Sequence, residues 1–293
     1  MSSRRRILFS IGLAVAVVTA SLVLTACGSS KSASATNSSS PGANLQLVTP
    51  GVLTIGSTWP YPPFVYNDSS GNLTGWGVEE LAAVAEHMGL KAVWVNTDFS
   101  TIFTALAHNR FDLVGPGITA YANAGTPAYQ TVQQREKVIT FAEPYMEVQQ
   151  ALMVNVAKTP DIQSVDNLKK GDRVAVQSAT SGAYLAEQLL TPKGVSLVTF
   201  PEAPQMFEAL KVGQVVALLN DSPVSDYALR SLPGLAIVQR IVTGEKYACA
   251  FAQNRPDLLA AFNAGVTATF KDGSYARILA KYFPGEPVPS YAH

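Results

Sequence analysis

The chain of 293 residues contains little cysteine, little histidine and little charge. It has two cysteines and three histidines, and 14% of its residues are charged. His87, His108 and His293 are scattered, and none has a second metal-ligating residue at a useful spacing. A phosphate-binding loop and a catalytic-triad motif are also missing from the sequence. We therefore expect no metal site and no cofactor.

An excess of positive charge is missing as well. The 21 basic residues equal the 21 acidic residues in number. Removing the three arginines of residues 1–26 leaves 18 basic residues against 21 acidic ones, a net charge of −3 for the remaining chain. No basic stripe remains that would attract a phosphate backbone, so nucleic acid is excluded as a partner.

The first 27 residues have the pattern of an export signal. Three arginines, Arg4–Arg6, precede an uncharged apolar run from Ile7 to about Leu24, which is short for a membrane-spanning helix. The run ends in Leu-Thr-Ala-Cys, which resembles the lipobox of bacterial lipoproteins. This resemblance implies cleavage before Cys27 and acylation of its thiol. An ordinary signal peptide or a single membrane anchor is the alternative.

The sequence also predicts how the rest of the chain is divided. The segment GSSKSASATNSSSPGANL after Cys27 has too little apolar surface to fold, which indicates a flexible tether. The predicted organisation is a signal peptide at 1–26, a tether at 27–47, lobe 1 at 48–147 and 244–288, and lobe 2 at 148–243. The mature protein would then be exported and lipid-anchored to the outer face of the cytoplasmic membrane.

The folded part alternates between strand and helix patterns, which favours βαβ units and a mostly parallel sheet. Helices are expected over 78–90, over 100–109 with Ser100 as the cap, and over 181–190 and 204–213. Strands are expected over 91–97, 172–178, 196–200 and 215–221. Extended crossings near 145–152 and 238–248 would join two α/β lobes with a hinge and a ligand cleft between them. Cys249, in YACAFA, is expected to be a buried small hydrophobe.

Eight segments in order, between about Leu53 and Phe283, give the chain a family resemblance. They are YPPF, LTGWGVEEL, NTDFSTIFTAL, RFDLVGPGIT, REKVITFAEPYMEVQQALMV, VAVQSATSG, LLNDSPV and KDGSYARILAKYF. The chain resembles the periplasmic solute-binding proteins of polar amino-acid ABC transporters, family 3 of the bacterial extracellular solute-binding proteins. The resemblance implies a two-lobed, type II periplasmic-binding-protein fold. It also implies a monomeric, non-enzymatic protein that captures an L-amino acid or close derivative and delivers it to an ABC transporter permease.

Three positions are candidates for holding the charged ends of such a ligand. Arg135 stands six residues before Phe141, where the family has an arginine that grips the ligand carboxylate, and its guanidinium fork suits that role. Thr180 or Ser181 would lie at a helix N-terminus, which favours the same carboxylate. Asp221 matches the aspartate that pairs with the α-amino group. A surface arginine and plain helix caps are the alternatives.

Further candidates come from the same resemblance. Gly117 and Thr119 match positions that supply a carbonyl and a hydroxyl to the ammonium. Tyr61 and Phe99 match aromatic positions that enclose the ligand side chain, with Trp76 nearby. Aromatic residues after strands are also common in cores, which is the alternative for all three.

The chain departs from the family at two places. Residues 120–134 are about ten residues longer than usual and contain Gly, Pro and Asn, so they are expected to form a loop with Tyr121 and Tyr129 over the cleft. Thr58 and Gly77 stand where relatives often carry an acid. Without these acids, a polar uncharged or apolar amino acid is the expected ligand.

Two other functions use the same scaffold. A cyclohexadienyl-dehydratase-like enzyme would need a carboxylic acid as proton donor, and Asp221, Glu79 or Glu143 are the candidates. A ligand sensor would present the closed lobes to a receptor instead of a permease.

Overall fold

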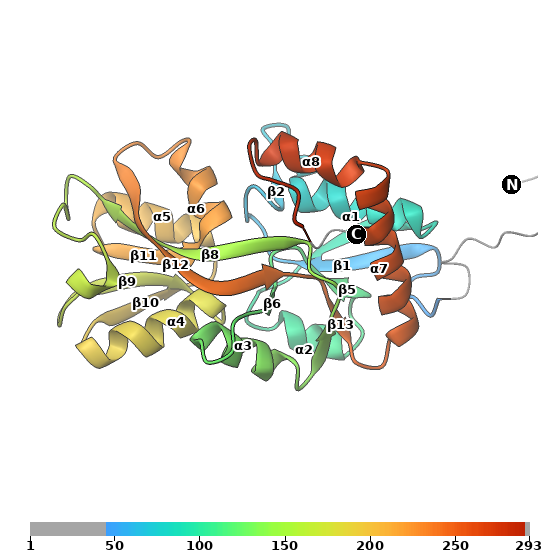
Figure 1. Ribbon diagram of the computed structural model, residues 1–293, viewed down its shortest axis with the longest axis horizontal. Helices are drawn as coiled ribbons and strands as arrows, with labels where there is room; N and C mark the ends of the chain where they lie inside the picture. The colour runs from blue at the N-terminus through green and yellow to red at the C-terminus, as the bar shows by residue number, and fades with distance from the viewer. Residues whose placement is uncertain (1–44, 291–293) are drawn as a thin grey trace, which may run out of the picture. The chain divides into compact units, whose positions relative to one another are not determined.

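The computed structural model describes residues 45–290, which belong to one compact unit (Figure 1). Two mixed sheets organise this part of the chain. We call the five-stranded sheet and its helices lobe 1, and the six-stranded sheet and its helices lobe 2. The predicted signal peptide, the predicted lipidation site Cys27 and most of the predicted tether lie outside the described residues.

The sheet of lobe 1 has the strand order β4-β1-β5-β13-β7. β1 pairs in parallel with β4 and β5, as the alternating pattern predicted, and β13 pairs antiparallel with β5 and β7. The strands are β1 (Val52–Ser57), β4 (Lys91–Asn96), β5 (Leu113–Val114), β7 (Ile139–Phe141) and β13 (Ala250–Ala252). The helices are α1 (Trp76–His87), α2 (Ile102–Ala107), α7 (Pro256–Lys271) and α8 (Ser274–Tyr282), beside a small hairpin of β2 (Tyr66–Asn67) and β3 (Leu73–Thr74).

The sheet of lobe 2 has the order β10-β9-β11-β8-β12-β6, with a parallel half and an antiparallel half. Its strands are β6 (Thr119–Tyr121), β8 (Met146–Asn155), β9 (Arg173–Gln177), β10 (Ser196–Phe200), β11 (Ala217–Asp221) and β12 (Leu235–Tyr247). Its helices are α4 (Ser181–Leu190), α5 (Ala203–Val212) and α6 (Ser222–Leu229), with short 3₁₀ turns at η2 (Val165–Asn167) and η3 (Thr191–Lys193).

The long antiparallel strands β8 and β12 coincide with the two expected crossings. They lie side by side in opposite directions and extend between the two lobes (Figure 1). The pairing of β12 with β8 shifts register between Ile241 and Glu245, and Gly244 there has a φ of 68°. A side chain at Gly244 would collide with Asn123, so this irregular stretch requires glycine. A bulge of this kind gives the two crossing strands a place to bend.

Two details of lobe 1 differ from the sequence prediction. Ser100 does not cap α2, because its backbone N–H and hydroxyl both donate to Asp98 Oδ1 and close a turn before the helix begins. Leu45 and Leu47, inside the range predicted as tether, pack against the hydrophobic core. Arg255 also donates to the carbonyl of Gln46. The folded body therefore includes residues 45–47.

Helix α1 carries a carboxyl group into the core of lobe 1. Glu80 is 2% exposed, and its Oε1 accepts a hydrogen bond of 2.6 Å from Thr269 on α7. Its Oε2 has no hydrogen-bond partner within the described part of the chain. Burial raises the pKa of Glu80 to about 7. The fold of lobe 1 is therefore sensitive to pH at this position.

Cys249 lies in the core between β12 and β13, as predicted. It is fully buried, and its Sγ would lie 2.7 Å from a side chain placed at Gly115. Burial raises the pKa of its thiol, so the thiolate is scarce at neutral pH. Among residues 45–290, no helix has both the length and the apolar character that a bilayer crossing requires.

Candidate functional site

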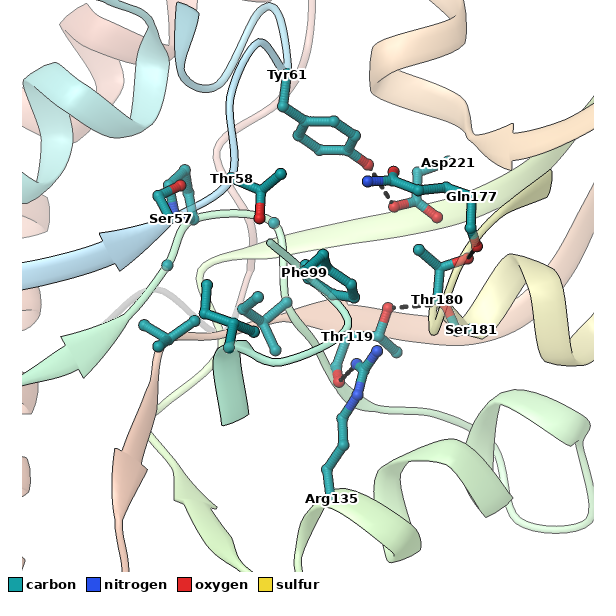
Figure 2. A pocket seen from close by; sticks show the side chains of 16 residues that line it. Ser57, Thr58, Tyr61, Phe99, Thr119, Arg135, Gln177, Thr180, Ser181 and Asp221 are labelled. Carbon is teal, nitrogen blue, oxygen red and sulfur yellow. Dashed lines mark hydrogen bonds between the residues drawn. The ribbon is translucent and has the colours of Figure 1, made fainter. Parts of the chain in front are cut away.

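A pocket lies where the ends of strands from both lobes meet (Figure 2). Lobe 1 contributes Ser57 at the end of β1, and lobe 2 contributes Gln177 at the end of β9 and Asp221 at the end of β11. The carboxyl ends of parallel strands are where α/β folds usually place ligands. Eight residues selected from the sequence line this pocket, namely Tyr61, Phe99, Gly117, Thr119, Arg135, Thr180, Ser181 and Asp221.

Trp76 does not line the pocket. Its ring is fully buried and contacts the rings of Phe64, Tyr145, Tyr275 and Phe283. The reason is that α1 begins at Trp76 and turns this face towards α8 and the core. Trp76 is therefore a core residue, which was the alternative to a position in the pocket. It is removed from the candidate site.

Arg135 is the last residue of helix α3 (Pro127–Arg135) and carries a buried positive charge. It is 6% exposed, and its guanidinium donates to the carbonyl oxygens of Thr119 at 2.8 Å and Ala179 at 3.4 Å. It also lies over the rings of Phe103 and Phe99, at 4.9 and 5.7 Å from their centroids. Burial lowers its pKa to about 10, which still leaves it charged at neutral pH. Within residues 45–290, no carboxylate lies within 4.0 Å of its guanidinium nitrogens, although Glu245 and Asp221 act on its charge from farther away.

Asp221 is the matching buried negative charge, and it comes from lobe 2. It is 7% exposed and accepts hydrogen bonds from Tyr61 Oη at 2.8 Å, Gln150 Nε2 at 2.5 Å and Tyr247 Oη. Asp221 precedes α6, but its side chain makes no capping hydrogen bond. Its carboxylate therefore remains at the pocket, which Asp221 lines, and no cationic side chain of the described residues forms an ion pair with it.

Helix α4 begins at the pocket. Thr180 is its N-cap, and the hydroxyl of Thr180 accepts from the N–H of Ala183 at 3.0 Å. Ala179, just before the cap, has a φ of 62°, which bends the chain sharply into the helix. The N–H groups of the first turn and the helix dipole favour an anion at this end. The expected helix terminus is therefore present, and both the capping and the ligand-binding interpretations remain compatible with it.

The walls of the pocket are aromatic and apolar. The ring of Tyr61 lies against Gly117, where a side chain would approach it to 3.2 Å and where φ is 81°. Phe99 packs edge-on against Phe103 with ring centroids 5.7 Å apart. Among the described residues, no group of His, Cys, Asp or Glu is arranged to hold a metal ion.

The two positions that lack the family's acids lie differently in the fold. Thr58 lines the pocket, and its hydroxyl donates to the carbonyl of Thr97 at 2.6 Å. Gly77 instead packs against Pro116, and an added side chain would come within 2.2 Å of that ring. Because Pro116 itself lines the pocket, a side chain at Gly77 would displace a wall of the site.

A polar network behind the pocket was missed by the sequence reasoning. It contains Gln150 on β8 and Glu245 on β12, which are fully or almost fully buried. Gln150 Nε2 donates to Asp221 and, at 3.2 Å, to Glu245 Oε1. The available signal was the alternation of Thr243, Glu245 and Tyr247, which places three polar side chains on one buried face of β12.

The sequence predicts a loop over residues 120–134, and this prediction is wrong. Most of the segment forms helix α3. Thr126 caps the helix by accepting from the N–H of Tyr129, and Pro127 occupies the first turn, where its missing N–H is harmless. Tyr121 donates instead to the carbonyl of Ala142, and neither Tyr121 nor Tyr129 lines the pocket. The Gly and Pro of this segment therefore mark the start of a helix.

Helix α3 connects the two lobes beside the pocket. It packs against α4, and the hydroxyl of Tyr184 on α4 donates to Gln130 Oε1 at 2.7 Å. Asn123, before the helix, donates its N–H to the carbonyl of Thr243 at the bulge of β12. Because Arg135 ends the same helix, α3 links the pocket, the crossing strands and lobe 2.

We expect loss of the Gln130–Tyr184 contact to accelerate ligand release. Tyr184→Phe and Gln130→Ala should each raise the dissociation rate about two- to tenfold, because a hydrogen bond contributes about 0.5–1.5 kcal/mol. Stopped-flow measurements of both variants and the double variant give the coupling between the two side chains. Gln133→Ala, an exposed position on the same helix, is the control. Fully additive effects would show that the contact does not hold the lobes together.

Comparison with known proteins gives a family match over most of the chain. Residues 53–285 match the family model of the bacterial extracellular solute-binding proteins, family 3. A probable histidine-binding protein of Neisseria gonorrhoeae is 25% identical over 277 residues, covering 94% of this chain and 96% of that protein. A probable amino-acid ABC transporter-binding protein of Haemophilus influenzae is 30% identical over 234 residues, covering 79% and 84%.

Solved structures show the same likeness. An ancestral arginine-binding protein bound to glutamine is 30% identical with a TM-score of 0.72, and the match covers 81% of this chain and all of that one. An ancestral amino acid-binding protein, described as a precursor of cyclohexadienyl dehydratase, is 29% identical with a TM-score of 0.71, covering 80% and 96%.

Proposed function

Because the chain belongs to the bacterial extracellular solute-binding proteins of family 3, we propose that it binds an L-amino acid or a close derivative between its lobes and delivers it to an ABC importer. The observation that carries the proposal is the pair of buried charges, Arg135 and Asp221, neither of which forms an ion pair within 4.0 Å among residues 45–290. Burying an unpaired charge is costly. A zwitterion supplies the missing partner for both.

The ligand then has a defined orientation in the pocket. Its carboxylate faces Arg135 and the first turn of α4 at Thr180 and Ser181. Its ammonium faces Asp221, with the Thr119 hydroxyl and the Gly117 carbonyl beside it. Its side chain lies between Tyr61 and Phe99. Thr58 lines the same pocket and is uncharged. This supports the prediction that the ligand has a polar uncharged or apolar side chain.

Binding and lobe closure are coupled in this arrangement. Tyr61 follows β1 of lobe 1, and Arg135 ends α3, which leads into β7 of lobe 1. Thr119 on β6, Thr180 and Asp221 belong to lobe 2. A ligand that contacts both sides stabilises the closed form only through contacts that the open form lacks. An importer can then distinguish the loaded protein from the empty one.

A thermal panel tests this proposal. Residues 39–293 are heated alone and with each common L-amino acid, and unfolding is followed by circular dichroism or dye binding. At a concentration of 100 times its dissociation constant, a ligand should stabilise the fold by about 2.7 kcal/mol. A shift with one amino acid or a small set supports the proposal. A flat amino-acid panel contradicts it, including when quaternary amines or osmolytes give a response.

The same panel checks the ammonium assignment through Asp221→Asn. This variant should lose most of its affinity for amino acids, because an amide is a much weaker partner for an ammonium than a carboxylate. Carboxylates without the amino group should bind the variant and the parent protein similarly. Equal losses for both ligand classes would contradict the assignment of Asp221 to the ammonium.

The dehydratase alternative is not favoured. Of its three candidate acids, Asp221 is surrounded by hydrogen-bond donors, as a carboxylate requires. Glu79 contacts Lys281 and Tyr282 outside the pocket, and Glu143 is exposed. Turnover of prephenate or arogenate would reverse this conclusion. The sensor alternative shares the binding chemistry, and capture of the partner with and without ligand separates it from transport.

We also propose that the protein acts as a monomer anchored through Cys27. The support is the Leu-Thr-Ala-Cys sequence and the polar stretch after it. In this proposal the tether spans 27–44, lobe 1 spans 45–147 and 244–288, and lobe 2 spans 148–243. Strand β6 lies within the first range of lobe 1 but pairs at the edge of the lobe 2 sheet. Metabolic labelling with a fatty acid analogue, compared between the parent chain and Cys27→Ala, tests the anchor. Light scattering tests the monomer.

A further inference from the structure

Glu245 is a buried carboxylate that touches the pocket only through other side chains. It is 1% exposed and does not line the pocket itself. Its Oε2 accepts from the hydroxyls of Thr119 and Ser181, both at 2.7 Å. Its Oε1 accepts from Thr243 at 2.7 Å and from Gln150 Nε2 at 3.2 Å. Thr119 and Ser181 line the pocket, so Glu245 stands directly behind two of its polar groups.

The charge of Glu245 decides what those hydroxyls present to a ligand. Each hydroxyl has one proton and two lone pairs. When Glu245 is ionised, the hydroxyls of Thr119 and Ser181 both donate their hydrogen bonds to Oε2, and only their lone pairs face the pocket. Their oxygens, 3.1 Å apart, then form a pair of acceptors. When Glu245 is protonated, it donates to one hydroxyl, which frees a proton to point into the pocket.

We propose that Glu245 is a positioning and specificity-determining residue, which turns the hydroxyl protons of Thr119 and Ser181 away from the pocket so that both oxygens accept from a ligand ammonium. The inference rests on the proposed function and deepens it. Ser181, selected from the sequence as a partner of the carboxylate, becomes a partner of the ammonium. The site then requires an amino group as well as a carboxylate.

The surroundings of Glu245 give binding a dependence on pH. The titratable groups that face it are Asp221 on β11, linked through Gln150, the guanidinium of Arg135 on α3, and the phenols of Tyr247 and Tyr61. Its chain neighbour Lys246 forms an ion pair with Glu147 at 3.6 Å. Burial, followed by the charge of Asp221, raises the pKa of Glu245.

A ligand ammonium beside the ionised carboxylate lowers that raised pKa again. Binding therefore releases part of a proton, and affinity rises with pH until Glu245 is ionised in the free protein. An analogue without the amino group favours the protonated form, so its affinity should not rise in this way. The two ligands thus have different pH profiles in the same pocket.

The test is isothermal calorimetry on the full-length protein in detergent. The probes are the amino acid that gives the largest thermal shift and its analogue lacking the α-amino group, for example L-glutamine and glutaramate. Titrations in buffers of different ionisation enthalpy, between about pH 5 and pH 8, count the protons released. The variants are Glu245→Gln and, as the matched control, Glu147→Gln, an exposed carboxylate on β8.

We expect Glu245→Gln to bind the amino acid at least about tenfold more weakly, because a charge-assisted hydrogen-bond network is lost. The analogue should lose much less affinity, and proton release should disappear. Glu147→Gln should match the parent protein. Equal losses for amino acid and analogue, or unchanged binding and proton release, overturn the inference.

Two outcomes remain separate from these. If Glu245→Gln does not fold, the test rests on the parent protein. Proton release on binding the amino acid but not the analogue supports the inference, and no proton release on binding the amino acid overturns it. If the parent protein binds no amino acid at all, the proposed function fails, and the inference fails with it.

Discussion

Arg135→Ala should weaken amino-acid binding by about 2–5 kcal/mol, which is about 30-fold or more in the dissociation constant. The guanidinium is held in place by two carbonyl oxygens and two aromatic rings, and it makes no ion pair with a carboxylate of residues 45–290. The guanidinium is therefore placed to bind the ligand carboxylate, as the proposed function requires. Removing it leaves the ligand carboxylate buried without a partner, and calorimetric titration measures the loss.

Two further variants make this result specific. Arg135→Lys keeps the charge but not the planar fork, so its affinity should lie between those of the parent and the alanine variant. Lys137→Ala removes an exposed cation two residues away, whose Nζ contacts Gln134, and should bind like the parent. Normal binding by Arg135→Ala would remove the carboxylate assignment and leave the site in need of another anion partner.

The second large effect concerns stability. The folded-state pKa of Glu80 is about 7, against an ordinary value of 4.5, so folding holds its proton more tightly than the unfolded chain does. Below about pH 4.5 the carboxyl is neutral in both states, and its contribution to stability is fully present. That contribution is lost as the pH rises through 7. The difference corresponds to about 3 kcal/mol in the free energy of unfolding above neutral pH.

Glu80→Gln should remove this loss, because an amide cannot ionise and can still accept from Thr269. Urea unfolding at a series of pH values should show the variant gaining stability over the parent as the pH rises. Glu79→Gln, one residue earlier, is the control with the opposite sign. Contacts with Lys281 and Tyr282 lower the pKa of Glu79, so its stabilisation is lost as the pH falls. A parallel pH profile for Glu80→Gln and the parent would contradict the prediction.

The sequence predicts well where periodicity and a local motif act together. Strand and helix alternation predicted the parallel parts of both sheets. Asp221 was selected from the family resemblance, and the structure places it at the carboxyl end of β11, where such folds usually hold ligands. Thr180 was found because a small hydroxyl residue before an amphipathic run is a local capping signal. Periodicity and capping motifs are set by residues that are close together in the sequence, so the sequence alone reveals them.

Two of the features that the sequence did not predict, the core position of Trp76 and the role of Glu245, depend on neighbours in space. Trp76 has the same local pattern whether its ring faces a pocket or a core, and packing against α8 decides between them. Glu245 lies in a strand without a motif, and its partners Thr119 and Ser181 are 126 and 64 residues away. The loop prediction for α3 has a different cause. Gly125 and Pro127 usually interrupt helices, but here they stand at the helix start, where Thr126 is the N-cap.

The burial of Cys249 makes the protein suited to fluorescence measurements. In a chain beginning at Ser39, Cys249 is the single cysteine. Its fully buried thiol should not react with a maleimide dye while the protein is folded. A cysteine introduced at Val242, which is 70% exposed beside the bulge of β12, would then be labelled alone. A dye at that position reports bending of the crossing strands, so ligand capture becomes a change in emission that can be followed in real time.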